Sequence, residues 1–134
     1  MLRGERQEDP RQDINRFIEA VVHDSQTGGY VRQAAIHRSW HAHVQECRAR
    51  KKFAGVLAPW GHGKSLQMSI ATPLYELGMN PNLRIKIVTN TPEFAQARLQ
   101  ACQEYILRSP EYQRIFPHIR SSKPGDWNKH KLVV

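Results

Sequence analysis

Apolar residues in the first third of the chain recur at helical spacing. Asp13 can cap a first helix, and the segment 23–29, with Gly28 and Gly29, is expected to end it. The apolar face of this helix consists of Ile14, Phe17, Ile18, Val21 and Val22. A second helix is predicted from 36 to 50, and its apolar face consists of Ile36, Trp40, Val44 and Cys47. Residues 1–35 are therefore interpreted as an N-terminal helical segment.

The pattern changes after residue 52. Residues 53–58 are apolar throughout, which is typical of a strand buried on both faces of a sheet. Residues 83–90 begin with apolar and basic positions in alternation and predict a second strand. The last five residues, 130–134, predict the start of a third strand.

Helical patterns separate these strands. Leu66, Ile70, Leu74 and Leu77 form one stripe, and Pro73 inside it predicts a kink or a shifted helix boundary. Thr91 and Ser109 each precede Pro-Glu, which is a typical opening of a helix. Strands that alternate with helices imply an α/β fold whose parallel sheet is built by right-handed crossovers.

The composition favours anionic partners. The net charge is +8 and the pI is about 9.9, which suits nucleotides or nucleic acid; a merely soluble basic protein is the alternative. The basic run of residues 48–52 either contacts DNA phosphates or is a solvated helix end. Cys47 and Cys102 are far apart and predict reduced thiols. The polar N-terminus and the lack of a long apolar run predict an intracellular protein without a membrane span.

The stretch "APWGHGKS" carries the strongest chemical signal. Glycines permit the positive φ angles of a phosphate-binding loop, and the N-terminus of the following helix attracts an anion. A lysine then reaches the terminal phosphates and a hydroxyl binds Mg²⁺. The candidate nucleotide-binding residues are Pro59, Trp60, Gly61, His62, Gly63, Lys64 and Ser65. Ala58 stands where the usual motif has glycine, and an ordinary glycine turn is the alternative.

This loop and the order of the segments after it, through "RIKIVTNTPEFAQARLQACQEYILRSPEYQRIFPHI", resemble the ATPase domain of the large terminase subunit of tailed bacteriophages. The resemblance implies a partial P-loop NTPase fold in residues 36–134, within a motor that packages DNA. It also implies ATP and Mg²⁺ as cofactors, and double-stranded viral DNA, the small terminase subunit and the portal as partners. A homo-oligomeric full-length motor in the host cytoplasm is expected.

Site roles follow from the same resemblance. Lys64 would hold the β- and γ-phosphates, Ser65 would coordinate Mg²⁺, and backbone groups of residues 59–63 would wrap the phosphates. Trp60 replaces an arginine that the family usually has. His41 is the nearest positional candidate for a contact with adenine.

Hydrolysis needs an apolar strand that ends in Asp, usually with a Glu that activates water. The acidic residues after the loop are Glu76, Glu93, Glu104, Glu111 and Asp126, and none follows an apolar strand. We therefore expect an N-terminal fragment of a longer ATPase, which binds nucleotide weakly and does not turn it over.

Alternatives remain open. One is a non-catalytic basic module that binds nucleic acid or a partner. The other is a different P-loop enzyme, such as a helicase-type ATPase. His37 and His41 have a spacing that can hold zinc, but a solvated helix face is the preferred interpretation. Trp127 is interpreted as the anchor of a loop.

Overall fold

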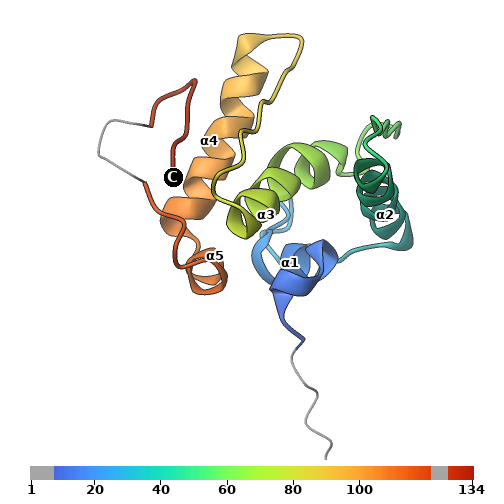
Figure 1. The fold of residues 1–134 in the computed structure, drawn as a ribbon, viewed down its shortest axis with the longest axis horizontal. Coiled ribbons are helices and arrows are strands. Elements are labelled where there is room, and N and C mark those ends of the chain that lie inside the picture. Colours follow the sequence, from blue (N-terminus) through green and yellow to red (C-terminus); the bar gives the residue numbers. More distant parts are fainter. Residues whose placement is uncertain (1–7, 122–126) are drawn as a thin grey trace, which may run out of the picture.

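The computed structural model describes residues 8–121 and 127–134, and their regular structure is helical (Figure 1). The elements are η1 (Pro10–Gln12), α1 (Ile14–Val21), α2 (Ala35–Ala49), η2 (Leu66–Ala71), α3 (Thr72–Met79), α4 (Pro92–Arg108) and α5 (Pro110–Ile115). η1 is a 3₁₀ helix and η2 is a π-helical segment that runs directly into α3.

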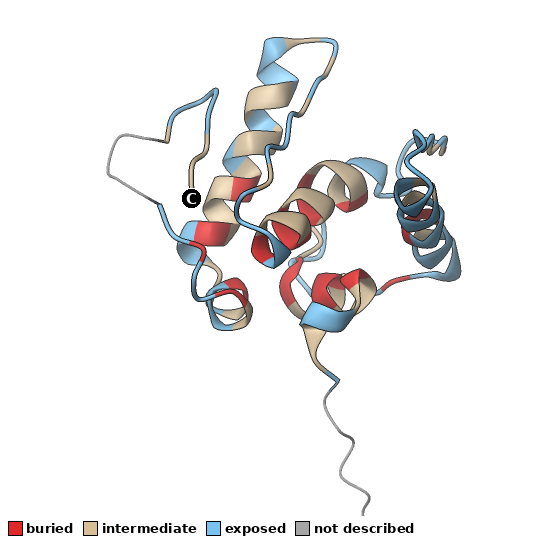
Figure 2. Ribbon diagram, in the orientation of Figure 1, coloured by how far each residue is buried: buried red, intermediate tan, exposed pale blue. Residues whose placement is uncertain are grey.

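The core forms where α1, α3, α4 and α5 meet, and Figure 2 shows buried positions on each of these helices. The predicted apolar face of α1 is confirmed, because all five of its residues are buried. The ring of Phe17 lies 5.4 Å from that of Tyr75, 6.0 Å from that of Tyr112 and 5.7 Å from that of Phe116, measured between centroids. These aromatic contacts join the first helix to segments far along the chain.

The predicted helix starts are confirmed by their caps. The side chain of Asp13 accepts a hydrogen bond from the backbone of Asn15, and Thr91 and Ser109 do the same for α4 and α5. Each cap satisfies a backbone N–H group that has no partner inside the helix.

The effect of Pro73 is a local widening of the helix. The backbone N–H of Thr72 bonds to the carbonyl of Gln67, five residues back, and the Thr72 hydroxyl donates to the same oxygen at 2.8 Å. Proline has no N–H group and its ring crowds the preceding turn, so a π turn relieves the strain. The turn also shifts the buried face from the predicted stripe to Gln67, Ile70, Ala71, Leu74, Tyr75 and Gly78.

Gly78 lies inside α3. A Cβ atom added there would come within 2.4 Å of the Phe116 ring. The glycine therefore makes room for an aromatic side chain in the core, and α3 ends one residue later at Met79.

The predicted α/β fold with a parallel sheet is wrong for the residues that the structure describes. In residues 8–121 and 127–134 there are isolated bridges at His23–Tyr30 and Asn128–Lys131 but no strands. Residues 53–58, predicted as a buried strand, project into solvent, with Phe53 and Leu57 104% and 97% exposed. Residues 83–90 are extended without strand pairing, and 130–134 form no strand either.

The physical reason is that a strand is stable only beside other strands that take up its backbone hydrogen bonds. The apolar pattern of residues 53–58 is compatible with a strand, but no partner strand lies next to it in the described part of the chain. The helices close the core without it.

Other side-chain expectations have mixed outcomes. The indole N–H of Trp127 donates to the carbonyl of Val133 at 2.6 Å, which confirms its interpretation as a loop anchor. Both cysteines are free, and burial raises the pKa of the Cys102 thiol to about 12. Ile36, predicted on the apolar face of α2, is 45% exposed. No helix in the described residues has the length and apolarity needed to cross a bilayer.

Candidate phosphate-binding loop

The loop before η2 has the backbone shape of an anion-binding turn. Gly61 and Gly63 have φ angles of 81° and 72°, in the left-handed region that favours glycine. Lys64 and Ser65 are already helical, and the N–H of Gln67 bonds to the Gly63 carbonyl at 2.9 Å. The expected helix start at residues 63–65 is therefore confirmed, and the free N–H groups of this helix end adjoin the glycines.

The loop is open to solvent. All of residues 59–65 are exposed, and Trp60 is fully so. The ammonium group of Lys64 donates to the carbonyl of Ala58 at 3.4 Å, so it folds back over the loop. The ring Nδ1 of His62 lies 3.1 Å from the carbonyl of Trp60. The predicted site residues are thus all accessible to solvent, and the Lys64 ammonium group lies against the carbonyl of Ala58.

His37 on α2 holds this loop from the side. Its Nδ1 accepts a hydrogen bond from the backbone N–H of Ala34 at 3.2 Å, so the ring proton lies on Nε2. That Nε2 donates to the carbonyl of His62 at 3.1 Å. The sequence indicated His37 only as half of a possible zinc pair, and no local signal predicts its contact with the loop.

His41, one turn further along α2, is buried with 2% of its surface exposed. Its Nε2 lies 2.8 Å from the side-chain oxygen of Gln67, so the imidazole donates there. Burial lowers the pKa of His41, although the bond to Gln67 acts in the opposite direction. A solvated helix face is therefore wrong for His41, and a contact with adenine stays a prediction for a side chain that is covered here.

A zinc pair at His37 and His41 has no support from the geometry. The two Nε2 atoms are engaged in different hydrogen bonds, one with the His62 carbonyl and one with Gln67. Among the described residues, no group of three His, Cys, Asp or Glu side chains is placed to hold a metal ion.

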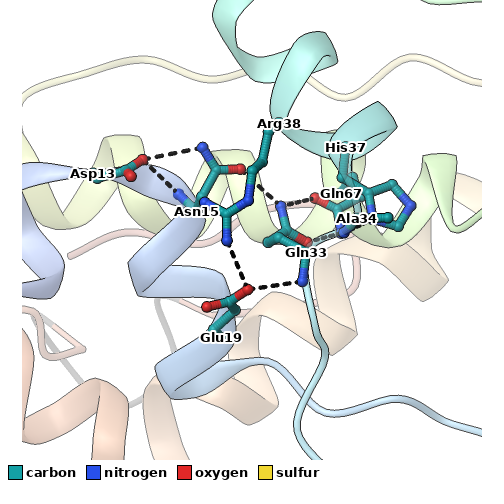
Figure 3. Close-up of polar contacts among 8 residues, drawn as sticks. All are labelled: Asp13, Asn15, Glu19, Gln33, Ala34, His37, Arg38 and Gln67. Atoms are coloured by element: carbon teal, nitrogen blue, oxygen red, sulfur yellow. Dashed lines mark hydrogen bonds and ion pairs between the residues drawn. The ribbon is translucent and has the colours of Figure 1, made fainter.

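Three amide side chains beneath the loop form a network that sequence reasoning missed (Figure 3). Gln67 and Gln33 exchange hydrogen bonds of 2.6 and 2.9 Å, and Gln33 also donates to Asn15 at 3.0 Å. Because Gln67 belongs to η2 and Asn15 to α1, the network anchors the loop helix to the first helix. The available signal was the position of Gln67, which precedes Ile70 and Leu74 by three and seven residues, the spacing of one helix face.

Glu19 fastens the segment before α2 to α1. Its carboxylate accepts hydrogen bonds from the backbone N–H of Gln33 at 2.9 Å and from the Arg38 guanidinium at 3.0 Å (Figure 3). The first turn of α2, which carries His37, is thereby tied to α1.

The basic run at the end of α2 is only partly neutralised. Arg48 forms an ion pair of 2.5 Å with Glu76, and Arg50 forms one of 2.9 Å with Glu46. Lys51 and Lys52 are exposed and have no ion pair within residues 8–121 and 127–134. Two cations thus remain available to an anionic partner.

Most of the carboxylates that follow the loop in the sequence already have a partner in an ion pair or a hydrogen bond. Glu76 forms its ion pair with Arg48, and Glu104 forms one with Arg108. Glu111 accepts a hydrogen bond from the hydroxyl of Tyr30. Glu93 is exposed in the first turn of α4. Asp126 lies outside the described residues.

No family model, curated protein or solved structure matches this chain.

Proposed function

We propose that residues 59–65 bind the phosphates of ATP together with Mg²⁺. The observation that carries the proposal is the succession of two glycines in the left-handed region, Lys64, and the first turn of a helix. Such a turn directs backbone N–H groups toward an anion, and the helix dipole adds to the attraction.

The proposed binding of MgATP uses backbone N–H groups, one lysine and one hydroxyl. Backbone N–H groups of residues 61–65 surround the phosphates, and Lys64, which now reaches only a carbonyl, turns to the β- and γ-oxygens. The hydroxyl of Ser65, one residue later, would bind Mg²⁺. Trp60 offers no charge to the γ-phosphate, unlike the arginine of the family that the loop resembles.

We further propose, on the resemblance to large terminase subunits, that this binding serves a DNA-packaging ATPase. Its partners would be double-stranded viral DNA, the small terminase subunit and the portal. The net charge of +8 and the uncompensated Lys51 and Lys52 support a DNA partner. The proposal rests on the resemblance of the loop segment and on the charge.

Replacement of the loop lysine tests the proposal. Lys64→Ala removes charge-assisted hydrogen bonds worth about 1.5–3 kcal/mol each, so the affinity for MgATP should fall about tenfold to hundredfold. Isothermal titration calorimetry measures the affinity, and Lys52→Ala is the matched control because it removes an exposed lysine outside the loop. His41→Ala should cost far less, provided that it folds. Equal losses in Lys64→Ala and Lys52→Ala would contradict the assignment.

A non-catalytic nucleic-acid-binding module is the second candidate, favoured by the two uncompensated lysines after α2. It predicts that Lys51→Gln with Lys52→Gln weakens binding of a DNA duplex and reduces the salt dependence by about one unit of slope per lost phosphate contact. Fluorescence anisotropy at several salt concentrations measures both. Duplex binding that persists unchanged in this double variant would remove that candidate.

A further inference from the structure

An apolar groove of about 400 Å³ lies on a different part of the molecule from the loop. It runs between α3, α4, the extended residues 83–87 and the C-terminal residues 129–132; in Figure 1 the last two segments lie on either side of α4. Leu77, Leu99, Ile87 and Leu132 are among its lining residues, and none of residues 59–65 is.

The extended segment that lines one side of this groove has backbone groups without hydrogen-bond partners in the described part of the chain. No N–H or C=O group of residues 84–88 forms a hydrogen bond with any residue that the structure describes. A second hollow, lined by Arg48, Thr72 and Val88, borders the same segment. An extended segment with free backbone groups and space beside it can pair with an incoming strand.

The rim of the groove is positively charged. Lys86, Lys129 and Lys131 line it, are exposed, and have no ion pair within the described ranges. No Asp or Glu occurs among the described residues that line the groove. A chain that lies along the groove therefore meets an apolar floor and uncompensated lysines.

We propose that this groove binds an extended segment of a partner protein in which apolar side chains alternate with Asp or Glu. A strand added beside residues 84–88 turns alternate side chains to opposite faces, so apolar ones enter the groove while carboxylates meet the lysines. The charge argues against a second copy of this chain, whose net charge is also +8. The apolar floor and the free backbone favour a peptide over nucleic acid.

The test begins with a displayed library of random decapeptides, selected on the whole chain. The expected result is enrichment of peptides in which apolar residues alternate with Asp or Glu. An enriched peptide is then labelled with fluorescein and titrated by anisotropy. Lys86→Glu and Lys129→Glu should each weaken it tenfold or more, and N-methylation of alternate peptide groups should weaken it similarly. Lys52→Glu is the matched control and should bind as the parent does.

Several results would overturn the proposal. They are the absence of enrichment, enriched peptides without carboxylates, and equal weakening by Lys52→Glu and Lys86→Glu. Displacement of the peptide by a DNA duplex would assign the groove to nucleic acid. A concentration-dependent dimer in sedimentation velocity that the peptide dissociates would assign it to a second copy. Lys64→Ala should leave peptide binding unchanged, so failure of the loop assignment and failure of this proposal are distinguishable.

Discussion

At the scale of single residues, two histidines one turn apart on α2 differ because packing places them differently. His37 is partly exposed and bonds to the carbonyl of His62 in the loop. His41 is buried and bonds to Gln67 beneath the same loop. The residue type is the same, but the neighbours decide whether the imidazole shapes the loop or secures the helix below it.

His37 should act as a positioning residue for phosphate binding. His37→Ala removes a neutral hydrogen bond, worth about 0.5–1.5 kcal/mol, so MgATP affinity should fall about twofold to tenfold. His37→Gln keeps a donor and an acceptor and should restore part of the loss. Calorimetry measures the affinities, with His43→Ala on the exposed side of the same helix as the control. Identical affinities in His37→Ala and His43→Ala would contradict this role.

Burial of His41 predicts a pH dependence of stability. Because the pKa of His41 is lowered in the folded state, the unfolded chain binds more protons below the ordinary value of 6.5. The contribution of neutral His41 is therefore complete above about pH 6.5 and is lost as the pH falls below it. Urea unfolding at pH 7.5, 6.0 and 5.0 should show a steeper loss in the parent chain than in His41→Gln, with His43→Gln as the control. Parallel curves for parent and His41→Gln would rule this out.

At the scale of elements, helix ends and helix interiors follow different rules. The caps at Asp13, Thr91 and Ser109 are local and could be recognised from the residue types. The interior of the η2–α3 helix depends on its surroundings, because the π turn before Pro73 sets which side chains face the core. Gly78 is then opposite the ring of Phe116.

Gly78→Ala tests this packing against helix propensity. Propensity alone favours alanine by about 1 kcal/mol in a helix. The added Cβ would lie 2.4 Å from the buried Phe116 ring, and overpacking of a core typically costs about 1–3 kcal/mol. We expect the free energy of unfolding to fall, measured by urea denaturation. Gly55→Ala is the control, since nothing lies within 4 Å of its added Cβ. Stabilisation by Gly78→Ala would disprove the contact.

At the scale of the whole molecule, the core is made by helices while an apolar segment stays outside it. Phe17 is completely buried among aromatic rings, whereas Phe53 is completely exposed. In a sheet that contained residues 53–58 as a buried strand, Phe53 would be buried. The two phenylalanines therefore distinguish a helical core from a core built on a sheet.

Phe53→Ser and Phe17→Ser make that distinction measurable. Surface substitutions change stability by about 0.5 kcal/mol or less, so Phe53→Ser should leave the thermal midpoint nearly unchanged. Truncation of a buried phenylalanine costs about 3–5 kcal/mol, so Phe17→Ser should unfold the chain or lower its midpoint by many degrees. Circular dichroism follows both transitions. A large loss of stability in Phe53→Ser would show that this segment is packed.

The sequence by itself determined the features that act over a few residues. Periodic apolar positions predicted α1, the caps predicted where α1, α4 and α5 begin, and the glycines before Lys64 predicted the turn and the helix start. These signals suffice because helical hydrogen bonds and caps join residues three or four positions apart. The exposed loop residues of the candidate site could be predicted for the same reason.

Only the tertiary structure decided the features that join distant residues. The apolar runs at 53–58 and 83–90 are compatible with strands, but a sheet forms only where partner strands meet, and none pair in the described part of the chain. The Gln33–Gln67 network, the contact of His37 with the loop, and the place of Gly78 beneath Phe116 likewise depend on helix packing. Such contacts are selected by how apolar faces and polar groups are jointly satisfied, which no single local pattern contains.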